Sequence, residues 1–243
     1  MNIKSSILCV FEGEVREPLY FNGLKQCFFG EQSIVYCCFG NNIYELHSKM
    51  LEDEDLDIFE VIQEYNTVDS NKDLFEKFSR DDFNQVFLFF DFEFHDDKFS
   101  SEDLTKMVET FDEETESGKL FVSYPMVEAI RDVPCHNSFI EHKIKTEQSK
   151  GKVYKGLSTQ GMTDYLDPRK INEERWTDLV RLNVEKGNFI QDGTRNNFKN
   201  PEQSDVLDCQ LKLVEGSNEL YVLSAFPLFV YHQKGSQFNF AKK

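Results

Sequence analysis

Short apolar runs alternate with longer amphipathic stretches through the first half of the chain. The apolar runs are rich in β-branched and aromatic residues, which is typical of buried strands. The predicted strands are 5–11, 33–40, 85–90 and 119–123. Helical spacing of apolar residues predicts helices after Pro18 and within 42–66, 72–83 and 100–114. This alternation predicts an α/β fold whose mostly parallel sheet is flanked by helices.

The pattern changes after Pro134, which predicts a boundary between a domain at 1–134 and a C-terminal, mainly helical region at 135–243. Helical periodicity is present at 172–186 and at 204–215. The apolar stretch 220–231 contains Pro227, so the sequence leaves open whether it is a kinked helix or an edge strand. Between these segments and the first domain lies a lysine-rich stretch, 142–155, whose glycines favour a solvated loop.

With 40% hydrophobic residues, including 24 Phe and 9 Tyr, the 243-residue chain can bury a large core without disulfide or metal staples. No apolar run approaches the roughly 20 residues of a membrane span, and the amino terminus turns acidic before a signal-peptide core can form. We therefore expect a cytoplasmic protein. The six cysteines form no CxxC pair, and we expect reduced core thiols.

Negative charge is concentrated in the first half of the sequence. Residues 1–128 contain 10 Lys and Arg against 29 Asp and Glu, whereas 129–243 contain 17 against 15. The acidic stretches are interpreted as solvated helix faces. If the protein contacts a polyanion, the second half or another subunit must provide most of the contacts.

Acidic side chains stand directly after the first and third predicted strands. Glu12 follows the first strand, and Asp91 and Glu93 follow the third. Ligands of open α/β sheets bind beyond the carboxyl ends of the strands, and side-chain alternation places residues i and i+2 on the same side. Crowded carboxylates need a proton or a cation, and oxygen ligands select Mg²⁺ or Mn²⁺. The alternative is that these acids are merely solvated.

Two segments carry a family resemblance. ILCVFEGEVREPLYFNGLK (7–25) resembles the EG-x-x-x-EP-x-YF signature of RloB-like proteins, and VFLFFDFE (86–93) resembles the acidic strand end of the Toprim domain. Toprim domains occur in topoisomerases, primases and the OLD-type and AriB-type nucleases of phage defence. The similarity covers roughly residues 5–130. The matching residues of the first motif are Glu12, Gly13, Glu17, Pro18, Tyr20 and Phe21.

The resemblance implies a Toprim-like fold for 1–134, with Glu12 as metal ligand or general acid/base. Asp91 and Glu93 then occupy the family's Asp-x-Asp metal position, although Glu93 departs from that pattern and moves its ligand oxygen outward. Glu128, in SYPMVEA, resembles a Pro-x-x-Glu element that can bind a second cation. Glu17 either reaches the metal or stabilises the start of its helix.

The lysine-rich stretch offers candidate nucleic-acid contacts, because ammonium groups beside an acidic site can hold phosphates and stabilise transition-state charge. Tyr154 either stacks on a base or is a buried aromatic. His95 either shuttles a proton or is incidental. The candidate phosphate contacts are Lys143, Lys145, Lys150, Lys152 and Lys155.

The leading hypothesis is a Mg²⁺-dependent or Mn²⁺-dependent Toprim nuclease that cleaves phosphodiester bonds in DNA or RNA, with tRNA included. The resemblance to OLD-type and AriB-type systems implies an effector of antiphage defence that works with an ABC-type ATPase. The alternative is a catalytically weak Toprim-fold interaction module that binds a basic protein through its acidic face. A primase or topoisomerase fragment is disfavoured, because the sequence has no zinc ribbon. Homo-oligomer formation is left open.

Overall fold

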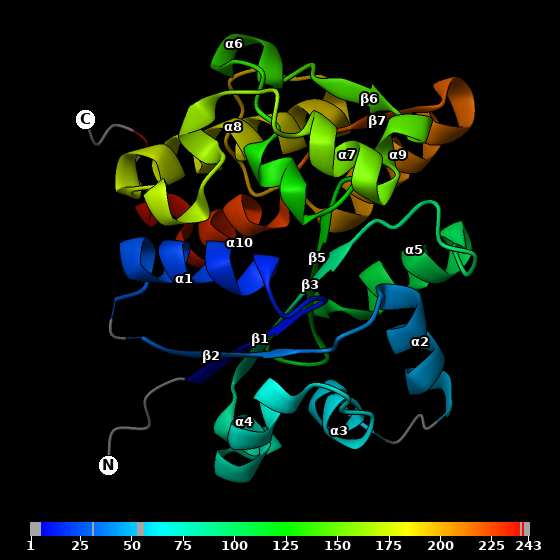
Figure 1. The fold of residues 1–243 in the computed structure, drawn as a ribbon, viewed down its shortest axis with the longest axis vertical. Helices are drawn as coiled ribbons and strands as arrows, with labels where there is room; N and C mark the ends of the chain where they lie inside the picture. Colours follow the sequence, from blue (N-terminus) through cyan, green and yellow to red (C-terminus); the bar gives the residue numbers. More distant parts are fainter. Residues whose placement is uncertain (1–5, 31, 53–55, 239, 241–243) are drawn as a thin grey trace.

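A computed structural model of the chain describes residues 6–30, 32–52, 56–238 and 240. Its main sheet has five strands in the order β2-β1-β3-β5-β4, and all neighbours are parallel except β4 and β5 (Figure 1). The strands of this sheet are β1 (Ser6–Phe11), β2 (Ser33–Cys38), β3 (Gln85–Asp91), β4 (Asp112–Glu113) and β5 (Gly118–Ser123). The predicted α/β class and mostly parallel sheet are confirmed.

Helices cover both faces of this sheet, as predicted. Helices α1, α8 and α10 lie on one face, and α3 and α4 lie on the other (Figure 1). The helices of the first half are α1 (Arg16–Phe28), α2 (Ile43–Glu52), α3 (Ile58–Glu64), α4 (Lys72–Lys77) and α5 (Ser101–Thr110). Those of the second half are α6 (His136–Phe139), α7 (Gly151–Leu157), α8 (Glu173–Asp192), α9 (Gln203–Ser217) and α10 (Ala225–Lys234).

Local sequence signals fix several helix ends. The Ser100 hydroxyl accepts a hydrogen bond from the backbone N–H of Asp103 and begins α5. That helix ends at Thr110, earlier than predicted, because the chain turns back to pair β4 with β5. Pro227 lies in the first turn of α10, where a missing backbone N–H costs no helical hydrogen bond, so the ambiguous stretch is largely helical.

The lysine-rich stretch is more ordered than predicted. Its first lysines form β6 (Lys143–Lys145), which pairs antiparallel with β7 (Glu219–Tyr221). Its last lysines lie in α7, so the prediction of a solvated loop is wrong. The periodicity of this stretch is hidden because each element is at most seven residues long. Burial of Ile144 and Tyr154 anchors the two elements.

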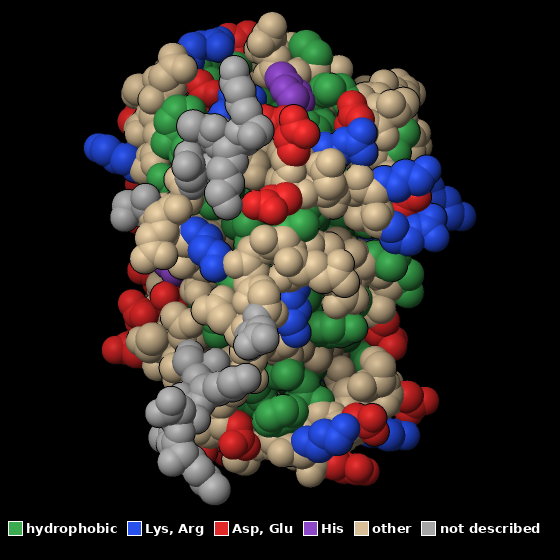
Figure 2. Space-filling model, turned by 90° about the vertical axis from the view of Figure 1, so that its left-hand side faces the viewer, with side chains coloured by type: hydrophobic (Ala, Val, Ile, Leu, Met, Phe, Trp, Pro, Cys, Tyr) green, Lys and Arg blue, Asp and Glu red, His purple; other side chains and the backbone are tan. Residues whose placement is uncertain are grey.

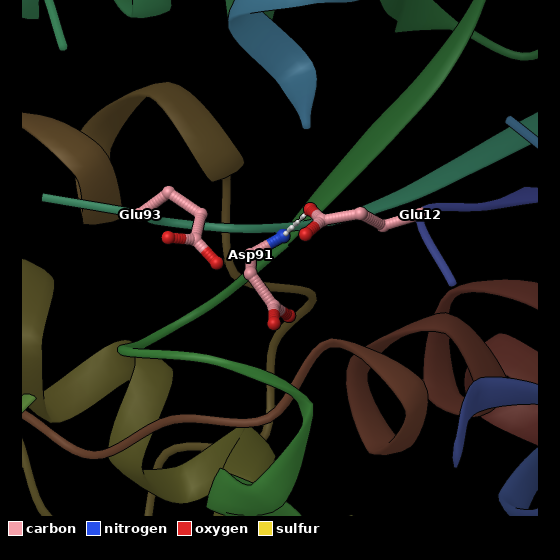
Figure 3. Close-up of side chains that lie close together, drawn as sticks. All are labelled: Glu12, Asp91 and Glu93. Carbon is pink, nitrogen blue, oxygen red and sulfur yellow. Dashed lines mark hydrogen bonds between the residues drawn. The ribbon is translucent and has the colours of Figure 1, made fainter. Parts of the chain in front are cut away.

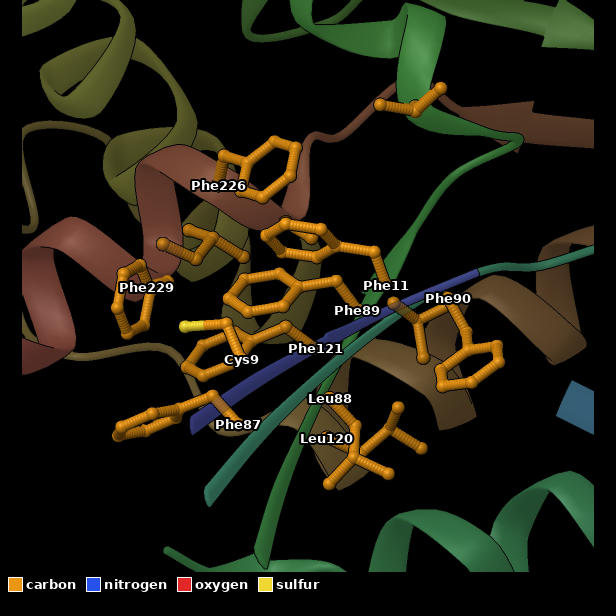
Figure 4. Close-up of a cluster of buried hydrophobic side chains, with 14 of the residues drawn as sticks. Cys9, Phe11, Phe87, Leu88, Phe89, Phe90, Leu120, Phe121, Phe226 and Phe229 are labelled. Carbon is orange, nitrogen blue, oxygen red and sulfur yellow. The ribbon is translucent and has the colours of Figure 1, made fainter. Parts of the chain in front are cut away.

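Aromatic side chains join the last helix to the centre of the sheet. Phe226 of α10 stacks on Phe89 of β3 with ring centroids 4.9 Å apart, and Phe229 meets the edge of Phe87 at the same distance (Figure 4). Phe11 of β1 contacts Phe226 at 5.7 Å. A single cluster of buried side chains therefore includes residues from both of the predicted regions.

Membrane and cysteine predictions can also be compared with the structure. No helix in the described part of the chain combines the length and apolar character needed to cross a bilayer. All six cysteines are free thiols, as predicted, and Cys9, Cys37 and Cys38 are buried. The prediction of a core position is wrong for Cys135, which is exposed beside Ser138 at the start of the short helix α6.

Replacing Phe229 with alanine should strongly destabilise the protein, because it removes a ring that contacts both β3 and β5. We expect a loss of about 3–5 kcal/mol in the free energy of unfolding, measured by urea denaturation followed by circular dichroism. Leu51→Ala, at an exposed position, is the control and should change stability little. Equal effects of the two substitutions would contradict the packing described here.

Candidate metal centre

Direct pairing of β1 with β3 brings Glu12 and Asp91 together. Phe11 lies opposite Phe89, and the backbone N–H of Glu12 continues the ladder by donating to the carbonyl oxygen of Phe89 at 3.1 Å. One carboxylate oxygen of Glu12 accepts a hydrogen bond from the backbone N–H of Asp91 at 3.0 Å. The two acids are 79 residues apart in sequence and share one edge of the sheet.

Glu93 completes a compact group of acids. One ligand oxygen from each of Glu12, Asp91 and Glu93 lies within 4.8 Å of the other two. Figure 3 shows the carboxylates of Glu12 and Glu93 approaching Asp91 from opposite sides. Asp91 is only 9% exposed, whereas the other two are partly exposed. The predicted convergence of these three residues is confirmed.

Strand alternation does not explain the position of Glu93. β3 ends at Asp91, and Glu93 has a left-handed backbone with φ of 45°. Phe92 anchors the strand end by donating its N–H to the carbonyl of Ser123, and the N–H of Asp96 donates to the carbonyl of Glu93. A non-glycine residue held this way costs on the order of 1 kcal/mol. A tight turn, and not the pleat, therefore directs Glu93 toward Asp91.

Burial and crowding favour the protonated forms of these acids. Burial, opposed by the Asp91 N–H hydrogen bond and reinforced by Glu93, raises the pKa of Glu12 to about 8. Burial and the Glu12 carboxylate raise the pKa of Asp91 well above its usual range. Burial and Asp96 raise the pKa of Glu93. Crowded carboxylate oxygens repel one another when ionised, and a hard divalent cation would neutralise them.

Two of the three acids, Glu12 and Glu93, border an open polar cleft of about 410 Å³. It is built by the loops after β1, β2 and β3, which are neighbours in the sheet. The side-chain amide of Asn42 donates to the Asp96 carboxylate at 2.7 Å and links the second loop to the third. The residues lining the cleft are Glu12, Gly13, Glu14, Gly40, Asn41, Asn42, Glu93 and Asp96. Solvent and a ligand can thus reach Glu12 and Glu93 from outside.

Glu17 and Glu128 lie near the group but outside it. Glu17 is buried in the first turn of α1, and its carboxylate accepts a hydrogen bond from the backbone N–H of Gly13 at 3.2 Å. This contact supports the helix-start interpretation. Burial raises the pKa of Glu17, and both Glu17 and Glu128 raise that of Asp91. Glu128 is 1% exposed, and its Oε2 has no hydrogen-bond partner within the described residues.

The five candidate lysines divide into two sets. Lys143 and Lys145 both form ion pairs with Glu219, at 2.8 and 2.9 Å. Lys155 of α7 instead lies 3.9 Å from the carboxylate of Glu128. Its charge partly offsets the rise that burial causes in the pKa values of Glu17 and Glu93. Lys150 and Lys152 are exposed at the start of the same helix. Lys155 is therefore the lysine of this set that the structure ties to the acidic group.

Two residues that the sequence analysis missed hold α7 beside the acids. The guanidinium of Arg131 donates to the carbonyl of Lys155 and to the hydroxyl of Ser158, both at 3.0 Å. Asp132 accepts a hydrogen bond from the hydroxyl of Tyr154 at 3.0 Å. Arg131 and Asp132 follow directly after the segment that carries Glu128. Nothing in their sequence spacing indicates contact with a helix more than 20 residues away.

The remaining aromatic and histidine candidates have structural contacts. Tyr154 is fully buried, which confirms the buried-aromatic alternative and leaves no ring face for a base. Nε2 of His95 lies 2.6 Å from the carbonyl oxygen of Thr146, so this ring joins the turn after Glu93 to the lysine-rich segment. His95 is not part of the compact acidic group.

Comparisons of this chain with protein-family models, with curated proteins and with solved structures found no match. The geometry and electrostatics of Glu12, Asp91 and Glu93 are therefore what indicates a functional site.

The raised pKa of Glu12 predicts that stability of the metal-free protein falls as pH rises. A carboxyl whose folded-state pKa is about 8 against an ordinary 4.5 contributes stability that is complete below 4.5 and lost by about 8. Glu12→Gln keeps an oxygen acceptor but cannot ionise. We expect the variant to melt about 2–6 °C above wild type at pH 8. At pH 4.5 the two proteins should have the same melting temperature, as measured by differential scanning fluorimetry. Glu76→Gln, at an exposed acid, should show no such pH-dependent gain in melting temperature.

Cation binding should depend on Asp91 more than on any exposed acid. We expect Mn²⁺ to bind wild type with release of about one proton or more at pH 7, because the site is protonated when metal-free. Asp91→Asn should weaken binding at least tenfold. Isothermal titration calorimetry in buffers of different ionisation enthalpy measures both quantities. Binding that is undiminished in Asp91→Asn would exclude the site.

Proposed function

We propose that this chain is a divalent-metal-dependent nuclease with a Toprim-like fold that cleaves phosphodiester bonds in DNA or RNA. The observation that carries the proposal is the convergence of Glu12, Asp91 and Glu93 at the carboxyl ends of two adjacent parallel strands. The resemblance of 7–25 and 86–93 to RloB-like and Toprim sequences supports the same assignment. It is also consistent with an open cleft that can admit a polymer backbone.

The acidic group has the donor chemistry for Mg²⁺ or Mn²⁺. Glu12, Asp91 and Glu93 would hold the cation, which supplies positive charge for phosphate oxygens and acidifies a bound water. Glu17 and Glu128 add negative potential at Asp91 and raise its pKa, and Oε2 of the buried Glu128 has no hydrogen-bond partner among the described residues. As the alternative to holding the cation, Glu12, whose metal-free pKa is about 8, can hold or give up a proton near neutral pH, as a general acid or base must.

Lysines of α7 would complement these acids on the substrate side. The charge of Lys155 acts on Glu93, which borders the cleft, so its ammonium would lie near a phosphate bound there and could stabilise transition-state charge. Lys150 and Lys152 are exposed on the same helix and suit phosphate contacts along a strand. Lys143 and Lys145, paired with Glu219, are weaker candidates.

The charge of the first half bears on regulation of such an enzyme. Residues 1–128 contain 29 acidic against 10 basic residues, so the surface that this half of the isolated chain presents repels nucleic acid. We propose, as the sequence resemblance implies, that the chain is an effector of antiphage defence whose access to substrate is assisted by a partner, an ABC-type ATPase. Activity of the isolated chain is then expected to be low and sensitive to ionic strength.

Cleavage assays with purified protein test the activity directly. Plasmid DNA, single-stranded DNA and total tRNA would be incubated with Mg²⁺, Mn²⁺ or EDTA. We expect metal-dependent cleavage of at least one substrate, a loss of at least 100-fold in Asp91→Asn, and a loss of about tenfold or more in Lys155→Ala. Separating rate from affinity in single-turnover experiments distinguishes lost chemistry from lost binding.

A matched control guards against trace nuclease contamination. Lys145→Ala removes a lysine that is paired with Glu219 and should retain near wild-type cleavage. Cleavage that persists in Asp91→Asn, or that is insensitive to EDTA, would contradict the proposal. Absence of cleavage both alone and in the presence of a co-expressed ABC-type ATPase would do so as well.

A further inference from the structure

A groove lies between α3 and α4, away from the acidic cleft. Its volume is about 500 Å³, and no residue of the acidic group borders it. In Figure 2, hydrophobic side chains gather low on the visible face, at the height of α3 and α4 in Figure 1. The residues lining the groove are Phe59, Glu60, Gln63, Phe75, Phe78, Ser79, Arg80 and Asp81.

Packing beneath the groove makes its aromatic floor rigid. Phe59 meets the edge of Phe75 with ring centroids 5.5 Å apart, and it packs on the buried Phe83 at 5.7 Å. Phe78 contacts Phe83 at 5.5 Å. Phe75 and Phe78 stay partly exposed, so they present apolar surface without the freedom to collapse into the core. A partner that binds there avoids the cost of ordering these rings.

Reciprocal capping hydrogen bonds fix the walls of the groove. The Asp57 carboxylate accepts from the N–H of Glu60, and the Glu60 carboxylate accepts from the N–H of Asp57, both at 3.0 Å. The Asp82 carboxylate accepts from the N–H of Ser79 at 2.8 Å. These bonds begin α3 and the turn after α4. The groove is thus a preformed feature of the fold.

The rim of the groove is negatively charged. Arg80 is the one cation among the described residues that line the groove. It forms an ion pair with Asp57 at 2.7 Å and donates to the carbonyl of Phe83, so its charge is already neutralised. Glu60 and Asp81 remain exposed on the rim. The described segment 56–82 contains 8 acidic against 3 basic residues. This potential repels nucleic acid and another acidic surface.

We propose that this groove is a docking site for a partner protein's basic segment that carries an aromatic or aliphatic anchor. The anchor would occupy the space between Phe75 and Phe78, and flanking Lys or Arg side chains would lie against Glu60, Asp81 and the exposed ring faces. Complementary charge would speed encounter and select against acidic partners. The proposal is independent of the proposed nuclease activity.

Selection from a random 16-residue peptide library on phage tests the proposal with the full chain as bait. We expect enriched peptides to combine Lys or Arg with an aromatic or aliphatic residue. Fluorescence anisotropy of a synthesised peptide would then compare variants at 150 mM salt. Asp81→Lys should weaken binding at least tenfold, and Glu76→Lys less than threefold, because Glu76 is exposed on α4 but does not line the groove.

The apolar part of the site has its own variant. Phe78→Ala should weaken peptide binding at least tenfold. Asp81→Lys changes an exposed residue and should keep the wild-type melting temperature, so it still tests the site if Phe78→Ala is destabilised. Equal weakening by Asp81→Lys and Glu76→Lys would show general charge attraction and overturn the proposal. Lack of enrichment, or enrichment of acidic peptides, would also overturn the proposal. So would a dimer in sedimentation experiments that Asp81→Lys abolishes, because a second copy of the chain would then cover the groove.

Discussion

Direct parallel pairing of β1 with β3 is the constraint from which the candidate site follows. The register that places Phe11 opposite Phe89 also places Glu12 beside the backbone N–H of Asp91. The side-chain period of a strand is two residues, so a slip of one residue would turn Glu12 away from the cleft and the aromatic rings away from α10. The core packing therefore enforces the same register that assembles the acids.

Burying acids at that edge is unfavourable, and the structure offsets this locally. The Glu12 carboxylate is held by one backbone N–H, and Glu17 by another. Burial raises the pKa values of Glu12, Asp91 and Glu93, which favours their protonated forms when no cation is bound. The stability for this arrangement comes from the aromatic core beneath it, where Phe87, Phe89 and Phe121 pack against α10.

The two halves of the sequence make different contributions to one site. The first half supplies the three carboxylates of the acidic group and all of the net negative charge, because 129–243 contains 17 basic against 15 acidic residues. The second half supplies α10, which covers the sheet, and α7, which brings Lys155 to Glu128. Arg131 and Asp132 connect these contributions, because they follow Glu128 in the chain and hold α7 by three hydrogen bonds. Lys155 of α7 is thus held beside Glu128 through one short segment.

The sequence by itself determined the fold class, the positions of the four main strands along the chain and the acids at two strand ends. These features are local: apolar runs of strand length and a change from period two to helical spacing are visible without tertiary contacts. The resemblance of the first motif added functional expectations that the pattern of apolar residues could not provide. The expectation that Glu12 and Asp91 meet follows already from their positions at the carboxyl ends of two strands of a parallel sheet.

Only the tertiary structure decided how the acidic and the lysine side chains are arranged. The left-handed turn at Glu93, the pairing of Lys143 and Lys145 with Glu219, and the approach of Lys155 to Glu128 all depend on contacts between distant segments. The lysine-rich stretch was predicted to be a loop because its strand and helix are too short to show a period, and burial of Ile144 and Tyr154 defines them instead. Short elements take their structure from what they pack against, which a single sequence does not display.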